Sequence, residues 1–185
     1  MKFNLSAVAI VAAATFASIG AQAADGTITF NGTVTDTTCS INGAAAGAGD
    51  KTITLPSVSK ASLAAAGQTA GTSSPADIKF ALTGCTGSAT KVVARFENGP
   101  TVDQASGRLV NTAGAGAATN VQIELLNKDQ QPINVTTNSN NAVAANGATI
   151  ASGAANLVYY GRYYATGAAT AGSVSSTVQY TMQYQ

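Results

Sequence analysis

The stretch Gly26-Thr-Ile-Thr-Phe-Asn-Gly-Thr-Val34 carries the first strand pattern of the chain. Polar threonine and asparagine side chains occupy one face of this stretch. The other face holds Ile28, Phe30, Gly32 and Val34. Such period-two alternation is typical of a half-buried β-strand.

A second alternating stretch, Val178-Gln-Tyr-Thr-Met-Gln-Tyr-Gln185, closes the chain. It places four side chains on one face: Val178, Tyr180, Met182 and Tyr184. Chain ends usually fray unless another element docks them. Two patterned ends therefore predict that both termini pair with other strands.

An export signal precedes the first strand. Met1 and Lys2 give a positive start, Leu5 to Gly20 is apolar, and Ala21-Gln22-Ala23 fits a cleavage site. The alternative, a membrane anchor, is disfavoured because the apolar stretch is short and no charged flank follows it. We therefore expect residues 1–23 to be a signal peptide.

Length and charge restrict the class of protein. Cleavage after Ala23 leaves 162 residues, which suits a single domain, and removes Lys2, so that eight basic residues balance eight acidic ones. There is no basic run of the kind that recruits nucleic acid. Only 9% of residues are charged, and a net charge near zero permits self-association.

Cys39 and Cys85 are the only cysteines. An even count in an exported chain predicts one disulfide, which closes a loop of 46 positions and by loop entropy stabilises the fold by roughly 4 kcal/mol. Two cysteines without any histidine do not form the usual zinc sites, and their spacing is not that of a redox pair. We expect no metal and no cofactor.

Strands separated by Gly, Ala, Ser and Asn linkers fill the rest of the chain. Besides the N-terminal strand we expect Lys51–Leu55, Asp77–Leu82, Lys91–Phe96, Arg108–Asn111, Val121–Leu126, Asn156–Tyr164 and Val174–Tyr184. About eight strands in one domain predict an all-β protein with two packed sheets. Helix is expected only at Ser59–Ala66, because the alanines of 142–155 lack a 3.6-residue apolar stripe.

The residue types of the chain also argue against enzyme activity. The chain has no histidine, which removes the usual activation of a serine or cysteine nucleophile. The only glutamates, Glu97 and Glu124, lie in or beside different predicted strands, which does not suggest a glycosidase pair. No glycine-rich segment joins a strand to a helix as phosphate binding requires. We expect no catalysis and no small-molecule substrate.

Several further motifs, together with both ends, resemble one family. They are Gly26–Val34 followed by Cys39, Ala61-Ser-Leu63, Leu82-Thr-Gly-Cys85, Ala118-Thr-Asn-Val121 and Arg162-Tyr-Tyr-Ala-Thr-Gly-Ala-Ala-Thr170. The combination is similar to the major subunits of type 1 fimbriae, the pilins of the chaperone-usher pathway. The resemblance covers essentially the whole mature chain.

The resemblance implies an incomplete immunoglobulin-like β-sandwich whose seventh strand is missing. The missing strand leaves an apolar groove beside the C-terminal strand. Residues 24–37 would be a donor extension that fills the groove of a neighbouring copy, and 38–185 the pilin domain. Ile28, Phe30 and Val34 would fill apolar pockets, while Gly32 would leave room where the groove is shallow. Such strand addition combines main-chain hydrogen bonds with side-chain pockets.

The family pattern also assigns partners to the C-terminus. A periplasmic chaperone would hold the groove strand until an outer-membrane usher replaces it with the next subunit, so that the protein would reach the cell surface as a fimbria. Gly172 stands fourteenth from the end and Tyr184 is penultimate, as in the family's recognition signature. The carboxylate of Gln185 would be held by basic residues of the chaperone.

Two other functions remain open at this point. The chain is either a major subunit or a minor pilin that caps, joins or terminates the fibre, since the family shares one fold across these roles. A self-complete secreted adhesion module of the lectin type is the other class. The tyrosines around Gly161 and Arg162 can stack a sugar in principle, but strand alternation places some of these rings in the core and others at the surface.

Overall fold

The computed structural model describes residues 28–30, 32, 34, 36–42 and 49–185. The chain divides into two units, Met1–Thr33 and Val34–Gln185, and nearly all described residues belong to the second. The expected signal peptide lies outside the described residues, as do positions 26, 27, 31 and 33 of the expected N-terminal strand. The described residues of that stretch, 28–30, 32 and 34, are not part of a strand, because none of them pairs with another described residue.

The larger of two sheets contains seven strands, and all of its neighbouring strands pair antiparallel. Its main path runs through β1 (Ser40–Ile41), β3 (Ile78–Thr83), β9 (Ala155–Ala165), β6 (Val121–Leu126) and β5 (Leu109–Val110). Two short strands join it at the side: β2 (Thr69–Ala70), which pairs with β9, and β7 (Pro132–Ile133), which pairs with β6. The long strand β9 is the centre of this sheet.

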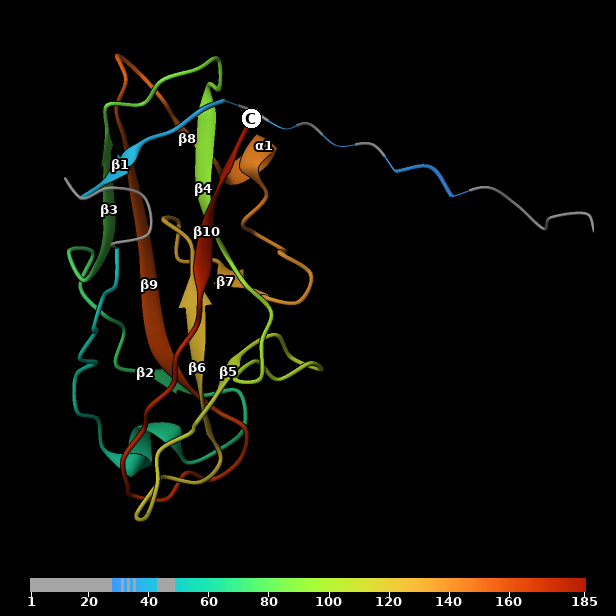
Figure 1. Ribbon diagram of the computed structural model, residues 1–185. Coiled ribbons are helices and arrows are strands. Elements are labelled where there is room, and N and C mark those ends of the chain that lie inside the picture. Colours follow the sequence, from blue (N-terminus) through green and yellow to red (C-terminus); the bar gives the residue numbers. More distant parts are fainter. Residues whose placement is uncertain (1–27, 31, 33, 35, 43–48) are drawn as a thin grey trace, which may run out of the picture. The chain divides into compact units, whose positions relative to one another are not determined.

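The smaller sheet has three strands. It consists of β10 (Tyr180–Tyr184), β4 (Lys91–Phe96) and β8 (Ala148–Thr149), in that order, with β4 in the middle. In Figure 1 the last strand, red, lies alongside the green strand β4. β10 is therefore an edge strand at the end of the chain.

The core lies between the two sheets. Phe80 and Leu157 of the larger sheet and Val92 and Phe96 of the smaller one belong to one buried cluster. Buried and more exposed residues alternate along β3 and most of β9, as in other β-sandwiches, whereas Val92, Val93 and Ala94 of β4 are all buried. A second, smaller cluster around Leu63 and Ala165 lies where η1 (Lys60–Leu63), a 3-10 helix, meets the end of β9.

Four predicted strands are confirmed with small changes at their ends. Asp77–Leu82, Lys91–Phe96, Val121–Leu126 and Asn156–Tyr164 correspond to β3, β4, β6 and β9. Arg108–Asn111 shortens to the two residues of β5, and the expected helical turn within Ser59–Ala66 is η1. The alternation of β-branched and aromatic residues was thus a sufficient signal wherever a strand has a neighbour on each side.

Three expectations need correction. Lys51–Leu55 does not form a strand, because it finds no strand partner among the described residues. Only Tyr180–Tyr184 of the expected Val174–Tyr184 strand is a regular strand, because the residues before it bond to irregular loops. One helical turn, α1 (Val143–Asn146), forms in the alanine-rich segment expected to lack helix, and it packs beside β4.

Candidate functional site: an unpaired strand edge

The hydrogen bonds of β10 all point to one side. Gln185 donates its N–H to the Lys91 carbonyl (3.0 Å) and accepts from the Lys91 N–H (2.9 Å), while Glu97 N–H donates to the Gln179 carbonyl (2.8 Å). In an antiparallel ladder the residues that bond to one neighbour alternate with residues that point away from it. Odd-numbered residues of β10 therefore face β4, and even-numbered ones face away.

The same alternation continues before β10. The carbonyl of Ser175 accepts from Thr112 N–H (2.8 Å), and that of Thr177 accepts from the Thr101 hydroxyl (2.6 Å). From position 174 to 184, the even-numbered residues thus expose their backbone N–H and C=O groups along one edge. Within the part of the chain that the structure describes, none of these groups has a hydrogen-bond partner.

The side chains of the even-numbered residues form a row that we call the acceptor row. It consists of Val174, Ser176, Val178, Tyr180, Met182 and Tyr184, all of them partly buried. The last four pack against the main core. Tyr180 stacks on Phe80 with ring centroids 4.7 Å apart, and burial raises the pKa of both Tyr180 and Tyr184. The row is thus an apolar surface that its own domain covers only in part.

Residues 50–58, which we call the facing segment, form a second unpaired edge. They have no regular secondary structure, and none of their backbone groups bonds to another described residue. Ile53 and Leu55 are half-buried between exposed neighbours, and Ile53 packs against the same core as the acceptor row. At the start of this segment the Tyr180 hydroxyl donates to the Gly49 carbonyl (2.7 Å). Both edges therefore border the same part of the core.

A domain with two unpaired strand edges beside a partly covered core can accept an added strand. Exposed edge groups of a sheet are a template for pairing with another chain. An added strand would satisfy the even-numbered backbone groups and cover the acceptor row. The geometry agrees with the sandwich expected to lack its last strand.

The C-terminus is held at the start of β4. A main-chain oxygen of the Gln185 carboxylate accepts hydrogen bonds from Thr90 N–H (2.6 Å), Lys91 N–H (2.9 Å) and the Thr90 hydroxyl (3.3 Å), although the residue as a whole is exposed. These bonds fix the end of the open edge.

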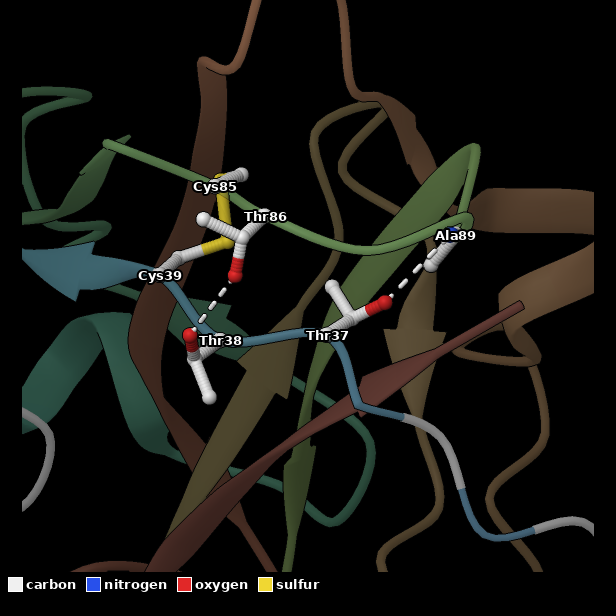
Figure 2. Close-up of a disulfide and its surroundings, with 6 residues drawn as sticks. All are labelled: Thr37, Thr38, Cys39, Cys85, Thr86 and Ala89. Carbon is white, nitrogen blue, oxygen red and sulfur yellow. Dashed lines mark hydrogen bonds between the residues drawn. A yellow bond between two sulfur atoms is a disulfide. The ribbon is translucent and has the colours of Figure 1, made fainter.

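The N-terminal segment is anchored to the loop between β3 and β4, the loop that also contains Thr90 (Figure 2). Cys39 and Cys85 form the expected disulfide, and the hydroxyls of Thr38 and Thr86 lie 3.0 Å apart. Ala89 N–H donates to the Thr37 hydroxyl (3.3 Å), and Thr37 is 7% exposed. Thr37, the last residue of the expected extension, is therefore bonded to the folded domain.

The apolar residues expected to act as a donor are exposed. Ile28 is 81% exposed, Phe30 90% and Val34 101%. A Cβ built on Gly32 would meet no atom within 4 Å. Large apolar side chains with this exposure in one short stretch are typical of an interaction segment.

Gly172 lies outside the acceptor row and has a packing role. The backbone of Gly116, Ala117 and Ala118 approaches it so closely that a Cβ would collide with it. Next to it, Ser173 bonds to this same loop through N–H to the Gly116 carbonyl (3.0 Å) and through its carbonyl to Ala118 N–H (2.9 Å). This contact sets where the acceptor row begins.

The tyrosine cluster is divided between the faces of β9. Tyr159 is buried in the core, whereas Arg162, on the other face, binds the buried carboxylate of Glu124 through its Nε (2.8 Å) and Nη2 (2.6 Å). Arg108 binds the other oxygen of Glu124 (2.8 Å) and stacks on Tyr164. Arg162 is therefore held in a structural ion pair.

Other kinds of site were sought over the same residues. Among the described positions no group of three or more His, Cys, Asp or Glu side chains is placed to bind a metal ion. Nor is any helix there both long enough and apolar enough to span a membrane.

Sequence reasoning did not identify Gly49 or Thr90 as part of this region, and it placed Thr37 at the end of the extension without predicting its bond to Ala89. Each acts through a backbone group or a single hydroxyl, and no periodic pattern marks such contacts. The one usable signal was the threonine pair before Cys39, because buried Thr hydroxyls are expected to be hydrogen-bonded.

Comparison with known proteins agrees with this geometry. Residues 55–185 match the family model described as "Type-1 fimbrial protein, A" (FimA). The major fimbrial subunit SMF-1 of Stenotrophomonas maltophilia is 46% identical, covering 91% of this chain and 97% of that protein. The F17 fimbrial protein of Escherichia coli is 43% identical, covering 95% of each.

Solved structures show the same fold. A subunit of a chaperone-usher pilus, in a study of rod uncoiling, has a TM-score of 0.56 at 24% identity and covers 88% of this chain and 96% of that one. An antigen and type I fimbria protein of Burkholderia pseudomallei has a TM-score of 0.51 at 25% identity and covers 82% and 97%. Both matches extend over nearly the whole of the solved chains.

Proposed function

The chain belongs to the type-1 fimbrial protein family and is a structural subunit of a fimbria, and we propose that it polymerises by donor-strand exchange. In this proposal residues 24–37 of one copy add a strand to the open edge of the next. Residues 38–185 form the domain that accepts it.

The observation that carries the proposal is the unpaired edge of the last strand. Even-numbered backbone groups from 174 to 184 have no partner among the described residues, and the acceptor row beneath them is only partly buried. Unpaired backbone groups and half-covered apolar side chains are both unfavourable, and one added strand removes both costs.

The exposed donor face fits this acceptor in chemistry and length. Ile28, Phe30 and Val34 are apolar and exposed, and burial of each stabilises by roughly 1.5–3 kcal/mol. The extension ends at Thr37, which is anchored to its own domain, so the preceding residues are available to a neighbour. A contact between two different surfaces of identical copies is heterologous, and such contacts build open filaments.

The transient partners follow from the same edge. Before assembly, a periplasmic chaperone would cover the acceptor row, and an outer-membrane usher would exchange it for the next subunit on the way to the cell surface. The C-terminal residues would be part of the chaperone's recognition surface. Deletion of Tyr184 and Gln185 should then abolish accumulation in the periplasm, and normal levels of the truncated subunit would contradict this role.

The proposal includes no catalytic role and no small-molecule substrate. The role within the fibre is that of the main rod subunit, supported by the high identity to a major fimbrial subunit. A minor subunit is the second candidate, because the minor fimbrial subunit HifD of Haemophilus influenzae is 35% identical over 98% of this chain. The amount of this chain in sheared fibres separates the two roles.

Thermal unfolding tests the exchange. Oxidised protein lacking the segment before Thr37 is measured with and without a peptide of residues 24–37, and with a matched peptide that carries Phe30→Asp. We expect a large rise in the melting temperature with the first peptide and little with the second. A high melting temperature without peptide, and no shift on adding it, would mean a self-complete adhesion module.

A further inference from the structure

We propose that the Asn98–Gly99 pair is a deamidation site of the fibre subunit and that the side chain of Gln104 controls the rate of this reaction. The pair lies directly after β4, in the loop that leads to β5. The reaction requires no exchange of strands, so it is independent of the assembly mechanism proposed above.

Deamidation at an Asn–Gly pair needs only the chain itself and water. The backbone nitrogen of the glycine attacks the side-chain carbonyl carbon of the asparagine and forms a new C–N bond. The bond from that carbon to the amide nitrogen breaks, and ammonia leaves with the proton of the glycine nitrogen. Water then opens the cyclic imide at either carbonyl, which leaves aspartate or isoaspartate. Glycine favours ring closure because it has no Cβ and its backbone is the least restricted.

The chain contains four Asn–Gly pairs, and the structure describes both residues of two of them. These two are Asn98–Gly99 and Asn146–Gly147. Asn31–Gly32 and Asn42–Gly43 each include a position outside the described residues. The two described pairs differ in the hydrogen bonds of their reacting groups.

The Asn146–Gly147 pair has hydrogen bonds on both reacting groups. Gly147 N–H donates to the Val143 carbonyl (3.0 Å), so the attacking nitrogen is engaged in the turn of α1. The side-chain oxygen of Asn146 accepts from Ala142 N–H (3.1 Å), which holds the amide at the start of the same turn. Attack would break both bonds, and we therefore expect this pair to react slowly.

The Asn98–Gly99 pair has a free attacking nitrogen. Gly99 N–H has no hydrogen-bond partner among the described residues, and a Cβ built on Gly99 would meet no atom within 4 Å. Asn98 is exposed, and both residues line a hollow, open to solvent, that also borders Thr177 and Gln179. Water therefore reaches the imide that the attack would form.

The side chain of Asn98 is restrained by Gln104. Nδ2 of Asn98 donates to Gln104 Oε1 (2.9 Å), and its Oδ1 accepts from Gln104 Nε2 (2.8 Å). The same Nε2 donates to the Val102 carbonyl (2.9 Å), and Val102 N–H donates to the Gly99 carbonyl (3.0 Å). Ring closure turns the Asn98 amide towards the backbone, so the amide has to leave Gln104 before it reacts.

The products would change the support of the last strand. Asn98 stands between two contacts with that strand: Glu97 N–H donates to the Gln179 carbonyl (2.8 Å), and the Thr101 hydroxyl donates to the Thr177 carbonyl (2.6 Å). Isoaspartate lengthens the backbone between these contacts by one carbon atom, and either product places a carboxylate next to Glu97. Deamidation therefore loosens this part of the acceptor strand.

Mass spectrometry of individual peptides measures the reaction. Fibres of the full chain are kept in mildly alkaline buffer, and the loss of the amide is followed in the peptides that contain Asn98 and Asn146. We expect faster conversion at Asn98. Gln104→Ala removes both hydrogen bonds of the Asn98 amide, so the rate constant at Asn98 should rise roughly fivefold or more, while that at Asn146 stays the same.

Two further variants test the role of Gln104. Gln131→Ala is the matched control, because Gln131 is exposed and bonds to Asn127 through its backbone; the rate at Asn98 should not change. Gln104→Glu still accepts from Asn98 Nδ2 but cannot donate to Asn98 Oδ1. Its effect should lie between those of wild type and Gln104→Ala.

Each part of the proposal can fail separately. Equal rates at Asn98 in wild type and Gln104→Ala overturn the role of Gln104, and conversion at Asn146 as fast as at Asn98 overturns the choice of site. If Gln104→Ala forms no fibres, Gln104→Glu supplies the comparison. The midpoint of guanidinium unfolding should fall as isoaspartate accumulates, and an unchanged midpoint overturns the effect on the last strand.

Discussion

The hydroxyl of Tyr159 accepts a hydrogen bond from the backbone N–H of Ala94, at 3.0 Å, across the two sheets of the domain. Tyr159 belongs to β9 and Ala94 to β4. The side chain of Asn141 completes the link, because its Oδ1 accepts from the Tyr159 hydroxyl (3.2 Å) and its Nδ2 donates to the Ala94 carbonyl (2.9 Å). Every polar atom of this buried junction is thereby paired.

Removal of that hydroxyl should destabilise the domain. Tyr159→Phe leaves the Ala94 N–H and the Asn141 oxygen unpaired in the core, which costs about 1–3 kcal/mol. The free energy of urea unfolding, measured on subunit complemented by donor peptide, reports this loss. Tyr160→Phe, on the other face of β9, is the matched control and should change the value little. Equal effects of the two changes would contradict the assignment.

The same tyrosine predicts a loss of stability at high pH. Burial raises the pKa of Tyr159 to about 12, against about 10 in an unfolded chain. Above pH ~10 the unfolded state therefore releases a proton that the folded state keeps, so the stabilisation, complete below that pH, is lost as the pH rises towards 12. The difference in unfolding free energy between wild type and Tyr159→Phe should shrink by about 2–3 kcal/mol over this window. A constant difference would contradict the shift.

Glu124 should be intolerant of neutralisation. It is 2% exposed and binds both Arg108 and Arg162, so Glu124→Gln leaves two partly buried cations without a counter-charge. Loss of one partner from a buried ion pair costs about 3–5 kcal/mol, and we expect about 2–4 kcal/mol here because both arginines retain some solvent contact. Asp129→Asn breaks an exposed pair with Lys128 and should cost below about 1 kcal/mol. Chemical denaturation of both variants makes the comparison.

Gly172→Ala should shift the start of the acceptor row. The added methyl group meets the backbone of residues 116–118, which cannot move aside as a flexible side chain would, and overpacking of this kind costs about 1–3 kcal/mol. Gly114→Ala is the matched control, since a Cβ there meets no atom within 4 Å. The yield of complemented subunit and its melting temperature should fall for the first variant only.

Strands with regular alternation were predictable from the sequence. β3, β4, β6 and β9 combine β-branched or aromatic residues with a neighbouring strand, so local preference and packing agree. Two-residue strands such as β1 and β2 were not predictable, because their pairing depends on loops that hold them against β3 and β9. The helical turn at Val143–Asn146 has no amphipathic stripe, and its place over β4 is set by tertiary contacts.

The open edge could be predicted only in part. The alternation at Val178–Tyr184 marks a strand, and resemblance to a family suggests what it pairs with. Which backbone groups are free depends on the partner of the odd-numbered residues, and that partner is β4, nearly 90 positions away in the sequence. The contacts of Tyr180 with Gly49 and of Thr90 with Gln185 likewise join segments that are distant in the sequence, so no local sequence pattern predicts them.

The disulfide at the root of the proposed donor extension has a mechanical consequence. A fibre under tension would pull each subunit at its extension, and this pull reaches Cys39 two residues after Thr37. From there the covalent bond carries it into Cys85, directly before the segment that leads to β4. The force therefore bypasses the 45 residues between the two cysteines, which include β1 and β3. While the disulfide is intact, these residues cannot unfold to lengthen the chain between the points of pulling.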